Sequence, residues 1–534
     1  MAINEDHFHC FLFRVKMSQI EGNMQKDQKP VNIVRSQSYQ SSDDIVESNN
    51  GNKKHFVYDS EIRKQRLEGG TKWRDVLVVL CAGFALISDG YQNNVMTMLN
   101  LVFPELYPKA YDAEMKTAVS NASLVGTIFG QIAIGFTCDY IGRKWSIVVA
   151  TCFLILGTVM CAASHGVTTD GMFWMLIISR GVTGFGIGAE YPASSVSANE
   201  AANESMKRRG GAFTLCTNLP LSFGGPFAII IFLIVYQITK GVDSGLWRTM
   251  FAIGAFWPLS VFYFRVKMAT SELYKKSAIK RRVPYWLAFK YYWPRLLGTC
   301  GCWFLYDFVT FPNGVFSGGI IQTILGDTDD LEKVAEWQLL LGIIAIPGVF
   351  VGAYLCDKIG RKYTLIIGFC GYIIFGLIVG IAYNKLKNIP ALFVIFYGLM
   401  MSSGNLGPGD MMGLVSLESF ATPIRATCYG FSAAIGKVGA VVGTKTFTPI
   451  QTNLPQGERW TFIIAAICGL SGVLVAFFLI PHLKEDDLLE EDIKFKNYLI
   501  DHGWDGEFGL QGEPSKDEEL QASSDDDDLQ VKVL

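Results

Sequence analysis

The sequence predicts an all-α membrane protein with about twelve transmembrane helices in two pseudo-symmetric halves of six, and three observations support this fold class. Of the 534 residues, 50% are hydrophobic and 18% are charged, whereas about 25% of the residues in soluble domains are charged. The hydrophobic residues are gathered in runs of about 20, the length that crosses the hydrocarbon core of a bilayer. One short motif also occurs once in each half of the chain, as an internal duplication requires.

The N-terminal segment, residues 1–72, is polar and is expected to be a disordered tail. The first long hydrophobic run starts near Val76 and many others follow it, so we expect no cleavable signal peptide. The expected spans are, in chain order, 75–101, 116–137, 145–163, 172–195, 210–236, 246–266, 292–320, 334–356, 363–383, 391–415, 426–449 and 460–480.

A basic segment at 267–290 divides these spans into an N-terminal six-helix bundle, 73–266, and a C-terminal one, 291–482. An acidic tail follows at 483–534. When the spans are counted in this way, lysines and arginines gather in the loops on one side, which the positive-inside rule assigns to the cytosol. We therefore expect a multi-pass protein with both termini and the basic segment in the cytosol.

The duplicated motif is D-x-x-G-R-K, which starts at Asp139 after the second expected span and at Asp357 after the eighth. Glycine permits a tight turn between two helices, and the aspartate can pair with the N-terminal end of a neighbouring helix. Two glutamates, Glu200 and Glu418, lie at span ends on the same side. We expect them to pair with loop arginines and to form a structural or gating lock rather than a substrate contact. The residues assigned to this lock are Asp139, Arg143, Glu200, Asp357, Arg361, Glu418 and Arg425.

The cysteines and glycines do not indicate a cofactor. Twelve cysteines fall mostly inside the hydrophobic runs, without metal-ligand spacing, and are interpreted as small packing residues. The glycine-rich stretch 180–192 has the letters of a dinucleotide loop, but no strand precedes it and it lies within a hydrophobic run. The sequence therefore predicts neither an enzyme nor a metal site, disulfide framework or nucleic-acid partner.

That glycine-rich stretch places Arg180, Glu190 and Tyr191 inside the fourth expected span. Ionisable groups in hydrocarbon are costly, so they usually face a cavity or a partner and mark an ion or substrate path. The glycines between them remove side chains from the helix surface and allow another helix to pack close. Arg180 has two interpretations of equal weight: a member of a proton path, or a structural partner of Glu190 or of a backbone carbonyl.

Polar residues also interrupt the first, fourth and fifth spans of each half, which is the pattern that a pocket between two repeats requires. Mid-span carboxylates such as Asp89 and Glu190 are costly unless they are paired or protonated. Because no histidine lies deep in a span, any proton chemistry is expected to fall to such carboxylates. The residues expected to bind substrate are Tyr191, Asn218, Trp303, Asp307, Phe311, Asn405, Asp410 and Lys437.

Lys437 lies well inside the eleventh expected span, between two glycines. A lone cation in this position suits a small anion as the substrate. It can also pair with Asp307 or Asp410 while the site is empty, and both interpretations can hold. Asp410 follows the sequence Gly-Pro-Gly, where we expect a break in the helix, so it either lines the cavity or accepts hydrogen bonds from freed amides.

These residues resemble the major facilitator superfamily over nearly all of 73–482, and the chain looks like its phosphate:proton symporter branch. The stretches that carry this resemblance are Asp89-Gly-Tyr-Gln92, Gly188-Ala-Glu-Tyr-Pro-Ala-Ser194, Trp303-Phe-Leu-Tyr-Asp307 and Gly436-Lys-Val-Gly-Ala440. The resemblance implies that Asp89, Arg180 and Glu190 serve proton coupling. It also implies that Tyr191, Trp303, Asp307 and Lys437 line the substrate site.

Departures from that branch change the expected substrate. Gln92 replaces an aspartate, Phe311 replaces a tyrosine and Gly409 replaces an asparagine. In the fifth span the expected glutamine is not clearly present, and Asn218 is assigned to its place. The hydroxyl and amide hydrogen-bond donors that would surround a bare phosphate are therefore missing. The pattern is similar to the fungal glycerophosphodiester permeases, which take up glycerophosphoinositol or glycerophosphocholine. This resemblance implies proton-coupled uptake at the plasma membrane, driven by the proton gradient without a cofactor.

Other functions remain open at this stage. An inorganic phosphate:proton symporter is the main alternative. A non-transporting nutrient receptor on a transporter fold ranks lower, because fold does not dictate function but the tails are modest in length. A sugar transporter is disfavoured by the lysine in the expected pocket. The sequence leaves the oligomeric state undetermined.

Overall fold

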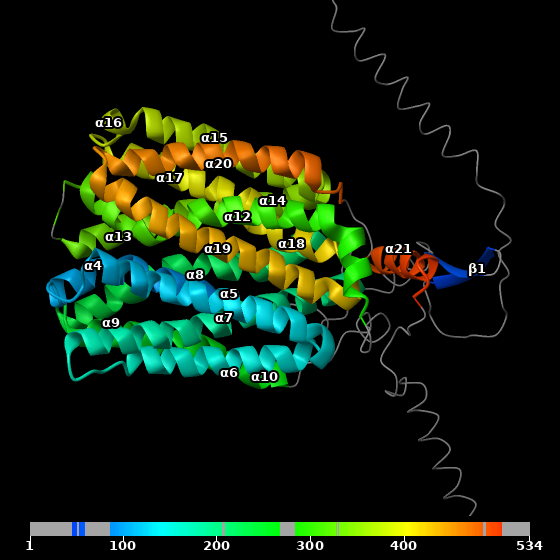
Figure 1. The fold of residues 1–534 in the computed structure, drawn as a ribbon. Coiled ribbons are helices and arrows are strands. Elements are labelled where there is room, and N and C mark those ends of the chain that lie inside the picture. Colours follow the sequence, from blue (N-terminus) through cyan, green and yellow to red (C-terminus); the bar gives the residue numbers. More distant parts are fainter. Residues whose placement is uncertain are drawn as a thin grey trace, which may run out of the picture. The chain divides into compact units, whose positions relative to one another are not determined.

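The computed structural model describes residues 45–50, 53–58, 86–205, 209–266, 283–326, 328, 330–483 and 488–504. They fall into two units. One unit, Gly70–Asp492 with Gly506–Leu534, holds a bundle of long helices (Figure 1). The other unit, Met1–Gly69 with Ile493–Asp505, holds a two-stranded sheet and the last turns of a helix. The fold class that the sequence predicts, an all-helical bundle, is confirmed for the first unit.

Within the described residues, the helices of the first half occupy each of its six expected spans. They are α4 (Leu86–Leu106), α5 (Ala113–Ile141), α6 (Arg143–Ala162), α7 (Thr169–Ser205), α8 (Arg209–Thr239), α9 (Ser244–Gly254) and α10 (Phe256–Val266). The sixth span is divided between α9 and α10. Residues 75–85 of the first expected span, and residues 267–282 of the basic segment, lie outside the described residues.

The helices of the second half match the remaining six expected spans, with interruptions in two of them. They are α12 (Tyr285–Ile324), α13 (Leu331–Ala345), α14 (Pro347–Lys358), α15 (Arg361–Ile381), α16 (Tyr383–Leu386), α17 (Pro390–Gly404), η1 (Asn405–Gly409), α18 (Asp410–Glu418), η2 (Thr422–Ile424), α19 (Arg425–Asn453) and α20 (Gly457–Leu479). Pro347 separates α13 from α14 because a proline lacks the N–H that would continue the helix. The tenth span is interrupted by η1, a π-helix, at the predicted Gly-Pro-Gly site.

Eight of these helical segments are long and apolar enough to cross a membrane: 113–141, 143–162, 169–203, 209–239, 331–358, 361–381, 390–418 and 457–479. The remaining expected spans correspond to α4, the α9–α10 pair, α12 and α19. Three of them, α4, α12 and α19, contribute polar residues to the central cavity described below.

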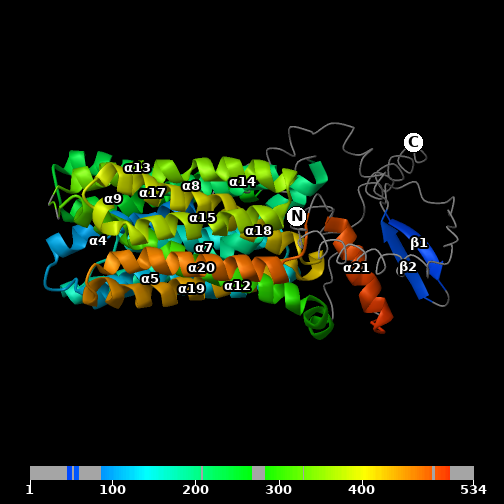
Figure 2. The ribbon, with the colours of Figure 1, turned by 90° about the horizontal axis from the view of Figure 1, so that it is seen from above.

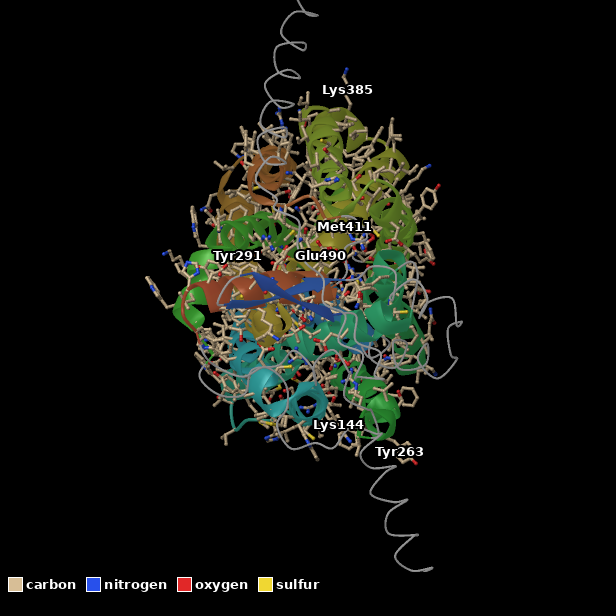
Figure 3. All side chains as sticks on the ribbon, turned by 90° about the vertical axis from the view of Figure 1, so that its right-hand side faces the viewer. Lys144, Tyr263, Tyr291, Lys385, Met411 and Glu490 are labelled. Atoms are coloured by element: carbon tan, nitrogen blue, oxygen red, sulfur yellow. The ribbon has the colours of Figure 1, made fainter. Side chains whose placement is uncertain are left out.

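The two halves pack against each other through a small number of helices. In the end-on view of Figure 3, cyan helices of the first half lie below, near Lys144, and yellow-green helices of the second half lie above, near Lys385. The contacts between halves pair α5 with α19, α8 with α13 and α14, and α4 with α12. Figure 2 shows α8 beside α13 and α14, and α5 beside α19, along the bundle. The second span of each half therefore packs on the fifth span of the other.

Close packing within the first half depends on the glycines of the fourth span. A side chain on Gly184 would overlap with the backbone of Ser123 in α5, and one on Gly188 would overlap with Thr127. Without these side chains, α5 and α7 approach until backbone meets backbone, which is a common way for membrane helices to pack. The expected role of these glycines is confirmed.

Both tails contain structure that the sequence analysis did not predict. Strands β1 (Ile45–Asn50) and β2 (Lys53–Tyr58) form an antiparallel pair with Asn50 opposite Lys53, inside the segment expected to be disordered. The intervening sequence is Gly-Asn, a dipeptide that suits a two-residue hairpin connection. The acidic tail begins with a helix, α21 (Leu488–Asp501). Its serine- and aspartate-rich end lies outside the described residues.

Candidate functional site

A cavity with a volume of about 220 Å³ lies between the two halves. Residues of α4, α7 and α8 line it from the first half, and residues of α12, α13, the α17–α18 segment and α19 line it from the second. All eight residues that the sequence analysis assigned to substrate binding are among the lining residues: Tyr191, Asn218, Trp303, Asp307, Phe311, Asn405, Asp410 and Lys437. The structure thus brings them together, and their contact with substrate stays a prediction.

An ion pair lies at one side of this cavity. Lys437 Nζ of α19 donates to Asp307 Oδ2 of α12 at 2.7 Å, and both side chains are buried. Of the two acids proposed as partners for this lysine, the structure selects Asp307. The ammonium group also lies 4.0 Å from the centroid of the Phe311 ring and 5.9 Å from that of Tyr191. The cation is therefore enclosed by one carboxylate and two aromatic rings.

Aromatic side chains from both halves surround this pair. Trp303 packs edge-on against Tyr429 at a centroid distance of 5.3 Å. The Tyr429 hydroxyl lies 3.2 Å from the Ser195 hydroxyl of α7, so it joins the two halves. Tyr191 lies within electrostatic range of both Asp89 and Asp307. Tyr191 is therefore influenced by one carboxylate from each half.

Amide and hydroxyl side chains cover other parts of the cavity wall. Sequence reasoning identified Asn218 and Asn405 but missed several others, namely Asn93, Asn94, Thr97, Ser222, Thr310 and Gln338. The sequence feature that could have identified some of them is the presence of amides, such as Asn93-Asn94, in an otherwise hydrophobic run. Asn218 Nδ2 donates to the main-chain carbonyl of Asp410 at 3.2 Å, and Asn405 Nδ2 donates to that of Ala345 at 2.9 Å. Amides and hydroxyls of this kind can bind a polyol.

The carboxylates of the first half have different partners from those considered in the sequence analysis. Glu190 of α7 forms an ion pair with Arg265 of α10, and both side chains are buried. Arg265 Nη1 also donates to the Thr151 hydroxyl at 2.6 Å. Asp89 of α4 lies within electrostatic range of both members of this pair, yet its two oxygens have no hydrogen-bond partner within the described part of the chain. Sequence reasoning missed Arg265, although it is an arginine within an expected span.

Arg180 is not part of this cluster. Its Nε donates to the main-chain carbonyl of Val119 in α5 at 2.9 Å, and its guanidinium lies 5.9 Å from the Phe251 ring centroid. Of the partners considered for Arg180, the structure thus selects a backbone carbonyl rather than Glu190. Ten residues separate Arg180 from Glu190 on α7, a rise of about 15 Å along the helix. The structure does not bring Arg180 together with the other two residues assigned to proton coupling.

The two D-x-x-G-R-K turns lie at one end of the bundle, which we call the motif end. Asp139 accepts from the backbone N–H and the hydroxyl of Thr427, at 2.9 and 2.8 Å, in the first turn of α19. Asp357 accepts from the backbone N–H of Gly211 in the first turn of α8 at 2.9 Å. Each motif aspartate therefore binds the N-terminal end of a helix of the opposite half, which confirms the expected type of contact.

A buried cluster of charges accompanies each motif aspartate. In the first gate cluster (Asp139, Arg143, Glu200 and Arg425), Glu200 Oε1 accepts from Arg143 at 3.0 Å and from Arg425 of the other half at 3.2 Å. In the second gate cluster (Asp357, Arg361, Glu418 and Arg209), Glu418 accepts from Arg361 at 2.9 Å and from Arg209 of the other half at 2.7 Å.

Glu200 and Glu418 thus pair with loop arginines, as expected, and the motif arginines among their partners are Arg143 and Arg361. Sequence reasoning included Arg425 in this set but omitted Arg209. The duplication could have identified Arg209, because it begins α8 as Arg425 begins α19. Both clusters bridge the halves, so they hold the motif end closed in this conformation.

Comparisons with known proteins agree with this architecture. Residues 76–495 match the family described as "Sugar (and other) transporter". Glycerophosphoinositol permease 1 of Candida albicans is 72% identical over 476 residues, covering 89% of this chain and 91% of that protein. Glycerophosphoinositol transporter 1 of Saccharomyces cerevisiae is 57% identical over 467 residues, covering 86% and 90%.

A solved structure shows the same fold at much lower identity. The proton:xylose symporter XylE of the major facilitator superfamily, bound to 6-bromo-6-deoxy-D-glucose, aligns with a TM-score of 0.65 and 18% identity. The alignment covers 79% of this chain and 98% of that one. At this identity the likeness concerns the fold alone.

Proposed function

The chain belongs to the sugar (and other) transporter family, and from this membership we propose that it takes up glycerophosphodiesters across the plasma membrane by proton-coupled alternating access. Members of this family are transporters, so the chain is not an enzyme. The observation that carries the proposal is the buried pair of Lys437 and Asp307 in a cavity shared by both halves. Glycerophosphoinositol is the substrate that we favour.

The Lys437–Asp307 pair suits the anionic part of such a substrate. A phosphodiester has one negative charge shared by two non-bridging oxygens, and one lysine can neutralise it. In the structure Lys437 is paired with Asp307, which compensates a cation that would otherwise be costly to bury. When the diester enters, its oxygens replace Oδ2 of Asp307 on the ammonium group. Asp307 is then available to accept a hydrogen bond from a hydroxyl group of the substrate.

The rest of the cavity suits a polyol. Asn93, Asn94, Asn218, Gln338 and Asn405 contribute amides, which can donate to and accept from hydroxyl groups. Gln338 Oε1 is buried without a hydrogen-bond partner in the described part of the chain, so an acceptor is available. A choline group has no donors for such acceptors. The names of the two similar fungal proteins support the same choice, because both specify glycerophosphoinositol.

Alternating access requires the halves to close at one end of the bundle at a time. The two gate clusters close the motif end in this conformation through Glu200–Arg425 and Glu418–Arg209. To expose the cavity at that end, the halves must break both pairs and withdraw Asp139 and Asp357 from the helix ends that they bind. The positive-inside pattern supports a cytosolic position for this end.

Proton coupling is supported by the carboxylates of the first half. Asp89 is fully buried without a hydrogen-bond partner in the described residues, which is costly for a charged carboxylate and acceptable for a protonated one. Glu190 and its partner Arg265 lie within electrostatic range of Asp89. A change in the protonation of Asp89 therefore alters the field at this ion pair, and Tyr191 lies within electrostatic range of both Asp89 and Asp307.

The test is direct uptake by yeast cells that lack their own glycerophosphodiester and phosphate permeases. Cells that express this chain receive labelled glycerophosphoinositol, glycerophosphocholine or inorganic phosphate in parallel, at several external pH values. We expect glycerophosphoinositol uptake to be the fastest and to increase as the external pH is lowered. Fast phosphate uptake with little diester uptake would favour the phosphate symporter instead. Cells with a vector alone, and cells expressing Lys437→Gln, are the controls.

A further inference from the structure

Two buried carboxylates of the bundle have no hydrogen-bond partner in the described part of the chain. They are Asp89 of α4 and Asp410 of α18. Other buried carboxylates there are bound to cations, among them Asp307 to Lys437, Glu190 to Arg265, and Glu418 to Arg209 and Arg361. Asp89 belongs to the proton path proposed above. Asp410 lies in the opposite half, and it is so far assigned only to substrate binding, as one of the residues that line the cavity.

We propose that Asp410 holds a proton in this conformation and is a second proton-binding residue of the transport cycle, located in the C-terminal half. The inference rests on the proposed proton coupling and adds a site to it. A charged carboxylate buried without a cation or a donor is strongly disfavoured, and such a group takes up a proton instead. Asp410 is only 1% exposed, and neither of its carboxylate oxygens accepts a hydrogen bond from a described residue.

Among the residues that the structure describes, none near Asp410 provides a compensating charge. Of the titratable groups on the helices packed around it, Tyr306 of α12 and Cys356 of α14 lie within electrostatic range. Both are neutral in their ordinary forms. On the α14 side, Asp410 Oδ2 lies against Gly352, where any side chain would overlap with it.

The charged groups on the same packed helices already have other partners. The buried cations of α7, α8, α15 and α19 bind other groups, namely Arg180 to Val119, Arg209 and Arg361 to Glu418, Arg425 to Glu200 and Lys437 to Asp307. The partly exposed Arg295 of α12 binds Glu491. The remaining acid of α14, Asp357, binds Arg361 and the start of α8. Because no described cation neutralises the negative charge of Asp410, this environment favours the protonated carboxyl group.

The backbone around Asp410 allows its environment to change during transport. It directly follows the π-helix η1, whose turns are wider than those of an α-helix and often occur at functional sites. Its main-chain carbonyl accepts from Asn218 of the first half at 3.2 Å. When the halves move apart at this level, that bond breaks and water reaches the carboxyl group. A proton taken from water while the cavity faces one compartment can then be released to water of the other compartment.

Infrared spectroscopy tests the protonation state without requiring transport activity. A protonated carboxyl absorbs separately from a carboxylate, and its band shifts in deuterated water. In the purified full-length protein, we expect Asp410→Asn and Asp89→Asn each to reduce this band. The matched control, Asp307→Asn, should leave it unchanged because Asp307 is a carboxylate paired with Lys437. An undiminished band in Asp410→Asn would overturn the proposal. If that variant does not fold, Asp410→Glu replaces it and should shift the band, while an unshifted band would overturn the proposal.

A second measurement separates this inference from the proton coupling on which it rests. Proteoliposomes are given a fixed pH difference of about one unit, and the final accumulation ratio of glycerophosphoinositol is measured. Loss of one coupled proton lowers the maximal ratio by about tenfold for such a gradient, so we expect this decrease in Asp410→Asn. If the wild type ignores the gradient, the proton coupling itself is wrong. If the wild type responds and Asp410→Asn reaches the same ratio, only the role of Asp410 is overturned.

Discussion

Lys437 is the residue on which anion recognition depends in this structure. Its ammonium group is buried, bound to Asp307 and stacked on Phe311, and no second lysine or arginine lines the cavity in the described residues. Any phosphodiester that enters the cavity therefore depends on this one cation. The same pair also contributes to stability, because removing one partner of a buried ion pair costs about 3–5 kcal/mol.

We expect Lys437→Gln to abolish diester uptake. Because this change leaves Asp307 buried without a cation, the matched variant Asp307→Asn/Lys437→Gln removes both charges and should recover the thermal stability of the purified protein. Uptake should remain absent in the double variant, since the cation is still missing. The measurements are uptake of labelled glycerophosphoinositol and melting in detergent. Substantial uptake by the double variant would show that Lys437 is not the anion site.

Phe311 and Gly409 are predicted to set the choice between a diester and phosphate. Phe311 lies against Lys437, and a Cβ on Gly409 would lie 2.9 Å from the Tyr306 hydroxyl, inside the cavity wall. The double change Phe311→Tyr/Gly409→Asn adds a hydroxyl and an amide there and fills space. We expect slower diester uptake and stronger competition by free phosphate. The assay is labelled diester uptake with excess inorganic phosphate, in the parent and the variant. Complete competition by phosphate in the parent would support a phosphate symporter.

At the scale of elements, the first turns of α8 and α19 are bound by the motif turns of the opposite half. Each gate cluster contains one glutamate that accepts from two arginines, one from each half. The pairs connect helix ends rather than cavity walls, so they are expected to influence the equilibrium between conformations rather than the affinity for substrate.

We therefore expect Glu418→Gln, Arg361→Ala and Arg209→Ala to slow transport while substrate affinity changes little. Arg209→Ala should act like Arg361→Ala because both arginines bind Glu418. Substrate affinity is measured on purified protein, and transport rate in proteoliposomes. A decrease in affinity of about a hundredfold in all three variants, or about 2.7 kcal/mol, would instead place this cluster in the substrate site.

The contact between α5 and α7 is a second feature at this scale. A side chain on Gly184 would overlap with the backbone of Ser123, which cannot move without shifting α5. We expect Gly184→Val to lower thermal stability in detergent by about 1–3 kcal/mol or to prevent folding. The matched control is Gly319→Val in α12, where a Cβ meets no atom within 4 Å. Equal stability of both variants would show that α5 and α7 separate without cost.

For the whole molecule, proton coupling predicts a dependence on external pH. Protons drive uptake, so uptake should fall as the external pH rises and should collapse when a protonophore removes the gradient. Asp89→Asn and Glu190→Gln should lose accumulation against a gradient more than they lose exchange. Glu190→Gln also leaves Arg265 buried without its partner, so its folding is monitored in parallel. Full accumulation by both variants at an unchanged pH profile would remove these residues from the proton path.

The sequence by itself determined the number, order and duplication of the spans, because hydrophobic length and a repeated motif are local properties of the chain. It also identified eight of the residues that line the cavity, most of them because a polar side chain in hydrocarbon must face another polar surface. The sequence also predicted that each motif aspartate binds the N-terminal end of a neighbouring helix, because the motif forms a short turn between two helices. The hairpin at 45–58 was missed, although its Gly-Asn sequence is a local signal.

Only the tertiary structure decided which charges pair. Glu190 binds Arg265 rather than Arg180, Lys437 binds Asp307 rather than Asp410, and Arg209 completes the second gate cluster. Each of these pairs joins helices that are far apart in the chain, and their formation depends on how the helices face one another. Span hydropathy carries no information on that rotation. Within the described part of the chain, the lack of a hydrogen-bond partner for Asp410 could be recognised only after these partners were known.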